Sequence, residues 1–145
     1  MENEGIVYFS LRGDFSPPEV TAQIGIEPTE SWSAHERDPA RKIPSCSGWT
    51  YSTERIIADV VDVYEMSNRL IRALKPYQGK IKSSVTEFDL QATLQVVLHI
   101  STDESMSTPA IGFDIEVIDF LSKVGATIDI DTYKNSDPDA TGQRR

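Results

Sequence analysis

An alternation of apolar and less apolar residues over positions 6–12 constrains the fold of this chain more than any other sequence feature. Every second residue from Val7 to Leu11 is apolar, which is the period of a strand with one buried face. A helix start follows, because Ser16 is a suitable N-cap and Pro17 takes the first helical position, where its missing N–H costs nothing. We therefore expect a strand followed by a helix that packs on it.

The strand period and the helix period recur along the chain. Apolar residues at three- and four-residue spacing predict a long helix over 56–74, which Pro76 ends because the residue before a proline disfavours helical geometry. Gly25 and Gly125 are expected to end two shorter helices. The predicted strands span 6–12, 26–32, 49–52, 93–100 and 127–133, and the predicted helices span 17–24, 56–74, 79–87 and 113–124.

This order of elements predicts an α+β fold with two layers. We expect one mixed or antiparallel sheet of about four to five strands with helices on one face, because this arrangement buries the apolar stripes of the helices. The length of 145 residues and the hydrophobic content of 39% fit one domain, which we assign to residues 1–134. Residues 135–145 lack periodicity and are predicted to form a disordered tail.

The chain is acidic, with 14 basic and 23 acidic residues and a net charge of −9. This charge argues against binding to nucleic acid, whose phosphates require a basic surface, and against binding to an anionic membrane surface. It favours a basic protein as partner, because opposite charges steer association. Cys46 is the only cysteine, which excludes an internal disulfide bond. The chain also lacks a signal-like start and a long apolar run, so we expect a cytoplasmic protein.

Four segments carry a family resemblance. They are Tyr8–Val20 (YFSLRGDFSPPEV), Ile24–Thr29 (IGIEPT), Gly48-Trp49 and Leu121–Tyr133 (LSKVGATIDIDTY). In these segments, over residues 6–133, the chain resembles the bacterial family of domains of unknown function numbered 4279. The resemblance implies a small cytoplasmic bacterial protein. It supplies neither an activity nor catalytic residues.

Catalytic and metal-binding patterns are weak in this sequence. His35 and Cys46 bracket a loop over 33–47, but their spacing offers no third orienting group and no oxyanion hole for a cysteine nucleophile. Two histidines and one cysteine match no zinc spacing. Asp129 and Asp131 lack the pattern of a calcium loop. We therefore assign no catalytic residue, no metal and no cofactor.

The surface most worth testing is the sheet face that points away from the helices. If the apolar residues of 6–12 face the helices, their neighbours point outward, and the outward residues of the last strand join them. Trp49 is expected in the core, whereas Trp32 could anchor a partner beside the loop 33–47. An ordinary solvated sheet face is the alternative. The candidate binding residues are Tyr8, Arg12, Trp32, His99, Asp129 and Asp131.

These observations favour a non-catalytic protein-interaction module, and an immunity protein that neutralises a basic toxin is one specific form of it. The alternative is a small polar-ligand-binding protein or an enzyme that uses the open sheet face, with Arg12 binding an anionic group and Asp129, Asp131 or His99 making polar contacts. Self-association into a homo-oligomer through an exposed sheet edge or face is a third hypothesis.

Overall fold

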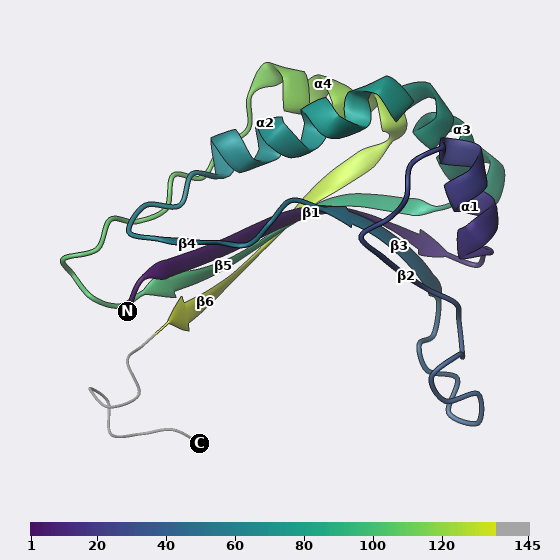
Figure 1. The fold of residues 1–145 in the computed structure, drawn as a ribbon, viewed down its shortest axis with the longest axis horizontal. Coiled ribbons are helices and arrows are strands. Elements are labelled where there is room, and N and C mark those ends of the chain that lie inside the picture. The colour runs from purple at the N-terminus through teal and green to yellow at the C-terminus, as the bar shows by residue number, and fades with distance from the viewer. Residues whose placement is uncertain (136–145) are drawn as a thin grey trace.

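The computed structural model describes residues 1–135 and shows one open sheet with its helices on one face (Figure 1). The strands are β1 (Asn3–Gly13), β2 (Glu30–Trp32), β3 (Ser47–Ser52), β4 (Ile56–Ala58), β5 (Gln91–Ser101) and β6 (Ala126–Asn135). The helices are α1 (Pro17–Ile24), α2 (Val63–Leu74), the short 3₁₀ helix η1 (Lys75–Tyr77), α3 (Gln78–Phe88) and α4 (Ile115–Val124).

The sheet is mixed, and its strand order is β2-β3-β1-β5-β6, with β4 also paired to β1. β1 runs through the centre and pairs antiparallel with β3, β4 and β5. β6 pairs parallel with β5, which requires a crossover connection, and α4 lies in that connection. The predicted α+β class, the mixed sheet and the helices on one face are confirmed.

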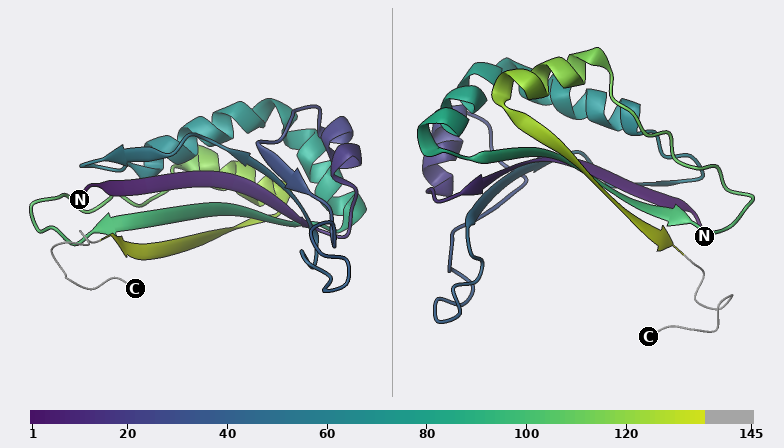
Figure 2. Two further views of the ribbon diagram at one scale, coloured as in Figure 1. Left: turned by 60° about the horizontal axis from the view of Figure 1, so that its bottom comes forward. Right: turned by 180° about the vertical axis from the view of Figure 1, so that it is seen from behind.

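The core lies between the sheet and the helix layer, and none of the described helices lies on the opposite sheet face (Figure 2). Alternate residues of β1 and β5 enter this core, and Phe9 meets Phe120 of α4 edge to face at 6.0 Å between ring centroids. Trp49 is fully buried, as predicted, and its Nε1 donates a hydrogen bond to Thr21 Oγ1 of α1 at 3.1 Å. The buried indole therefore joins the first helix to the sheet.

The prediction of one helix over 56–74 is wrong in its first part. Residues Ile56–Ala58 form β4, which pairs with Asn3–Gly5, and α2 begins only at Val63. Ile57 and Val60 are 59% and 54% exposed, so they do not belong to a buried helical stripe. Apolar residues of a short strand and its connection happened to continue the helical spacing. This extra strand also brings the sheet to six strands, instead of the expected four to five.

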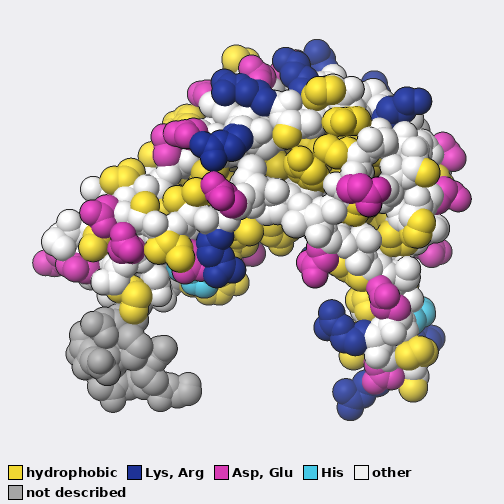
Figure 3. Space-filling view, in the orientation of Figure 1, with side chains coloured by type: hydrophobic (Ala, Val, Ile, Leu, Met, Phe, Trp, Pro, Cys, Tyr) yellow, Lys and Arg dark blue, Asp and Glu magenta, His cyan; other side chains and the backbone are white. Residues whose placement is uncertain are grey.

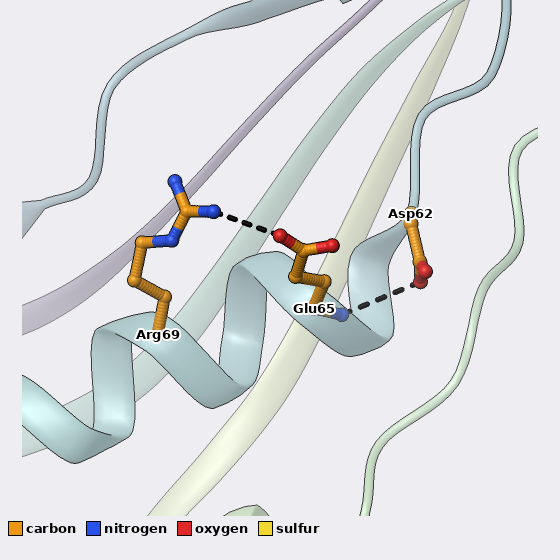
Figure 4. A network of polar contacts seen from close by, with 3 residues as sticks. All are labelled: Asp62, Glu65 and Arg69. Atoms are coloured by element: carbon orange, nitrogen blue, oxygen red, sulfur yellow. Dashed lines mark hydrogen bonds and ion pairs between the residues drawn. The ribbon is translucent and has the colours of Figure 1, made fainter.

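The true start of α2 is defined by Asp62, whose side chain accepts a hydrogen bond from the backbone N–H of Glu65 at 3.3 Å (Figure 4). Glu65 in turn pairs with Arg69 one turn later at 2.8 Å.

We expect Asp62→Ala to lower the free energy of unfolding by about 1 kcal/mol, because an N-cap is lost. Asp62→Asn keeps an acceptor and should retain most of that energy. Urea unfolding of both variants measures the difference, and equal losses would contradict this assignment.

The sheet extends one residue beyond the predicted domain boundary at residue 134. β6 continues to Asn135, whose side chain donates a hydrogen bond to the carbonyl of Glu2 at 2.9 Å. The last described residue is therefore part of the sheet. The remainder of the predicted disordered tail, residues 136–145, lies outside the described residues.

Candidate functional site: the open face of the sheet

The open face is the side of the sheet opposite the helices, and the strand registers place its side chains in rows. In one row Tyr8 of β1 stands beside Gln95 of β5, which stands beside Asp129 of β6. In another row Arg12 stands beside Gly48 of β3, and Gly48 stands beside Trp32 of β2. Segments that are far apart in the sequence therefore meet on one surface, as the figures show for the strands (Figures 1 and 2).

A polar hollow of about 520 Å³ lies over β1, β5 and β6. Gln95 organises its acidic side, because its Nε2 donates hydrogen bonds to Asp131 Oδ2 at 3.1 Å and to the carbonyl of Asp129 at 3.3 Å. The lining includes Tyr8, Ser10, Arg12, Gln95, Asp129 and Asp131. The hollow thus offers two carboxylates, one guanidinium and several neutral hydrogen-bonding groups to whatever enters it.

A second, more apolar hollow of about 270 Å³ adjoins the first. Trp32 forms one wall, and its indole is held in place because Nε1 donates a hydrogen bond to the carbonyl of Cys46 at 3.1 Å. The ring also covers Gly48, where a Cβ atom would lie 2.1 Å from Cζ2 of the indole. Tyr8 and Arg12 line both hollows and separate them. One continuous surface therefore has a polar part and an aromatic part.

Arg12 is the central cation of this surface. Its side chain is exposed and also lines a third hollow, beside Trp32, Arg37 and Cys46. Among the described residues, the guanidinium of Arg12 has no ion-pair partner, whereas five other basic side chains are paired. An unpaired guanidinium can form bidentate hydrogen bonds with a carboxylate or phosphate group.

Burial raises the pKa of Tyr8 above its ordinary value of 10.0, and Asp131, Asp129 and Glu30 raise it further against the opposing effect of Arg12. The folded protein therefore binds the phenolic proton more tightly than the unfolded chain. This contribution to stability is fully present below pH 10.0 and is lost as pH rises through the higher folded pKa.

We expect Arg12→Ala to raise the pKa of Tyr8 further and Asp131→Asn to lower it toward the ordinary value. The ultraviolet absorbance of tyrosinate, with Tyr8→Phe as the reference, measures both shifts. Glu54→Gln is a matched control, because Glu54 is exposed and is not among the charges that shift this pKa. A pKa that both charge substitutions leave unmoved would show that these groups do not share one site.

The structure places the six predicted site residues in three locations. Tyr8, Arg12, Asp129 and Asp131 meet in the polar hollow, and Trp32 lies in the adjoining hollow. His99 lies elsewhere on the open face. Its ring stacks on Tyr133 with 5.1 Å between ring centroids, and its β1 neighbour is Glu4, at the opposite end of the strand from Arg12. The structure therefore does not bring His99 together with the other five residues.

Two contributors to the site were not assigned from the sequence. Ser10 is only 5% exposed, lines the polar hollow, and its Oγ has no hydrogen-bond partner among the described residues. The alternation of β1 had already placed Ser10 on this face, so the signal was present. Glu30 lines the apolar hollow, and only the pairing of β2 with β3 brings it there.

Residues 33–46 form an arm that projects from the end of the sheet beside the open face (Figures 1 and 3). The arm has internal order, because Asp38 and Ile43 form a bridge and His35 N–H donates to the carbonyl of Pro44 at 2.8 Å. Its exposed basic residues are Arg37, Arg41 and Lys42. Cys46 lines the hollow at the base of the arm, but His35 does not. The structure thus does not unite these two residues in one hollow.

The fold and the site together define a small α+β protein with an open, arched sheet face that carries a mixed polar and aromatic surface. Within residues 1–135 no cluster of three metal-ligating side chains is found, and no helix there has the length and apolarity to cross a membrane.

The chain belongs to the family described as Domain of unknown function (DUF4279), whose model matches residues 3–135. The predicted family resemblance is thereby confirmed over nearly the whole chain. Comparison with curated proteins and with solved structures gives no significant match.

Proposed function

We propose that this protein is a non-catalytic protein-interaction module that binds a basic partner on the open face of its sheet. The observation that carries the proposal is the convergence of Tyr8, Arg12 and Trp32 on two adjoining hollows. Tryptophan, tyrosine and arginine are the residue types that contribute most binding energy at protein interfaces. Their side chains here come from two strands that the chain brings together only on folding.

The aromatic part of the surface is organised before any partner arrives. The hydrogen bond from Trp32 to the carbonyl of Cys46 and the contact with Gly48 hold the indole in one orientation. A side chain that is already fixed loses little conformational entropy on binding, so more of the contact energy appears as affinity. Trp32 is therefore suited to act as an anchor.

The charge of the surface supports a basic partner. Asp129 and Asp131 lie on one side of Tyr8, and Glu30 lies on the other. The net charge of −9 adds a long-range attraction for cationic proteins. Since such attraction is screened by salt, association should weaken as ionic strength rises.

The test is cross-linked affinity capture from cells of the source organism with the wild-type protein and two face variants, Arg12→Ala and Trp32→Ala. A basic protein should be captured in stoichiometric amounts at low salt, released at high salt, and lost from both variants. Arg72→Ala and Ile115→Ala are controls on the helix layer, where Arg72 is exposed and Ile115 is 80% exposed. Equal capture by face and control variants would refute the proposal.

The stricter form of the proposal is an immunity protein. If the protein has this role, the captured partner should inhibit growth when it is produced alone, and co-production of this protein should restore growth. Restoration should fail with Arg12→Ala and persist with Arg72→Ala. A partner that is harmless to growth would retain the interaction module and reject the immunity role.

A second candidate, a small polar-ligand-binding protein, is favoured by one specific observation. Within residues 1–135, Ser10 Oγ is buried without a hydrogen-bond partner at the polar hollow, and Arg12, which also lines this hollow, has no ion-pair partner. A ligand with an anionic group would satisfy both residues. Thermal unfolding with a panel of carboxylates and phosphate esters tests this candidate, since a ligand that binds only the folded state raises the midpoint. The shift should disappear in both Ser10→Ala and Arg12→Ala.

A further inference from the structure

The strand β6 forms one edge of the sheet. It is the outermost strand on its side, its ten residues pair with β5 alone, and no described strand lies along its other edge. The opposite edge of the sheet is much shorter, because its strand β2 has only three residues and continues into the arm. A long edge strand presents a row of unpaired backbone N–H and C=O groups that another chain can pair with.

The helix layer does not cover β6 as it covers β5. On the helix side of the sheet, Leu94 and Val96 of β5 are fully buried, whereas their β6 neighbours Ile128 and Ile130 are 39% and 38% exposed. Edge strands are usually protected by charged side chains, especially lysine, by proline or by a bulge. β6 contains no proline and only one lysine, and its two aspartates would repel an acidic strand but attract a basic one. The edge therefore combines free backbone groups with uncovered apolar side chains.

We propose that the basic partner adds a strand to the β6 edge, with lysine or arginine alternating with apolar residues. This inference rests on the proposed function and names how part of the partner is held. The alternation follows from β6 itself, since Asp129 and Asp131 carry the acidic groups of the polar hollow, whereas Ile128 and Ile130 pair with residues of β5 that are buried under the helices. In such a strand, main-chain hydrogen bonds supply affinity, and the alternate side chains supply specificity.

A second copy of this chain fits the edge less well than a basic strand. A closed twofold dimer would pair β6 antiparallel with its copy, and directly opposite residues would then share a face. If Ile130 lies opposite Ile128 of the copy, Asp129 lies opposite the Asp129 of the copy. If Ile130 lies opposite Ile130, Asp129 lies opposite Asp131. Like charges in directly opposite positions are destabilising. Lysine or arginine at those positions would instead form ion pairs.

The position of the edge connects it to the site. β6 contributes Asp129 and Asp131 to the polar hollow, so a strand added to β6 would run along the border of that hollow. One partner could thus place an extended segment on the edge and another part of its surface over Tyr8, Arg12 and Trp32. The two contacts can be separated by substitution, because Trp32 lies on β2, at the other end of the strand order.

The experiment uses a fluorescent peptide with blocked ends, of about the length of β6, in which lysine alternates with valine. Control peptides have the same composition in block order, glutamate in place of lysine, or N-methyl groups at alternate residues. Binding to the full chain is measured by fluorescence anisotropy, and backbone amide exchange is followed residue by residue by NMR. Sedimentation establishes the oligomeric state of the free protein.

We expect the alternating peptide to bind at least about tenfold more tightly than every control peptide, because each control removes the backbone pairing, the alternation or the charge match. New amide protection should appear along β6. Asp129→Lys with Asp131→Lys should weaken binding by about tenfold or more. Glu54→Lys with Glu104→Lys makes the same charge change on exposed loop residues and should have little effect.

The inference would be overturned by equal binding of all peptides, by protection away from β6, or by outer β6 amides that are already protected in the free protein. Dimerisation that protects β6 would likewise identify a second copy as the occupant.

Trp32→Ala separates this inference from the proposed function. If the captured partner is retained by Trp32→Ala and Arg12→Ala while the peptide protects β6, only the proposed use of the open face fails. If those variants lose the partner while the peptide leaves β6 unprotected, only the strand addition fails.

Discussion

Asn3→Ala is expected to lower the free energy of unfolding by about 3 kcal/mol. Asn3 is fully buried in β1 and makes three hydrogen bonds. Its Nδ2 donates to the carbonyls of Asp59 at 2.8 Å and Ser107 at 2.6 Å, and its Oδ1 accepts from the N–H of Ser101 at 2.7 Å. Alanine would leave these backbone groups without their partner.

Urea unfolding followed by tryptophan fluorescence measures this loss. Asn68→Ala is the matched control, because Asn68 makes only a surface hydrogen bond to Asp114 and should cost less than about 1 kcal/mol. Asn3→Asp adds a second test. It keeps the acceptor for Ser101 but directs a carboxylate at two carbonyls, so its destabilisation should grow as pH rises through the range where that carboxyl ionises. Equal stability of Asn3→Ala and Asn68→Ala would contradict this role.

Gly48→Ala is expected to remove the aromatic part of the binding surface without unfolding the protein. A Cβ atom at this position would lie 2.1 Å from Cζ2 and 2.3 Å from Cε2 of Trp32, so the indole must leave its place. The hydrogen bond from Trp32 to the carbonyl of Cys46 would break with it. The displaced side chain belongs to the edge strand β2, and none of the three residues of this strand is in the hydrophobic core cluster, so we expect a loss of only about 1–2 kcal/mol in stability.

The indole N–H signal of Trp32 in NMR spectra reports this displacement through faster hydrogen exchange, while the buried Trp49 should be unchanged. Partner capture by Gly48→Ala should be as poor as by Trp32→Ala. Gly79→Ala is the control, since a Cβ there meets no atom within 4 Å and the residue lies in α3. That variant should be more stable by about 0.5–1 kcal/mol and bind normally. Normal binding by Gly48→Ala would mean that Trp32 is not an anchor.

Local signals predicted several elements accurately because the determining interactions are local. α1 begins after Ser16 with Pro17 at its first position and ends at Gly25, which adopts the left-handed conformation that glycine favours. α4 likewise ends at Gly125. The backbone geometry at such positions depends on a few neighbouring residues. The ends of these helices can therefore be predicted without knowledge of the rest of the molecule.

Signals that depend on distant partners were misread. The segment Ile56–Ala58 continued the helical spacing of α2, but it pairs with β1 because a free strand edge was available there. Spacing alone cannot reveal that edge. The candidate site shows the same division, since alternation correctly placed Tyr8 and Arg12 on one face but could not exclude His99, whose distance from Arg12 depends on the register of β5 against β1.

The class of fold, the face to which each strand residue points and the acidic character of the surface follow from the amino-acid sequence, because period and charge are properties of the chain. Which outward residues meet depends instead on the folded arrangement of the strands. The order of the strands placed Trp32 over Gly48 and beside Arg12, brought Asp129 and Asp131 next to Tyr8, and put β6 at an edge along which no other described strand lies. These arrangements depend on pairing between segments that are distant in the sequence, and such pairing is set by the packing of the whole sheet against its helices.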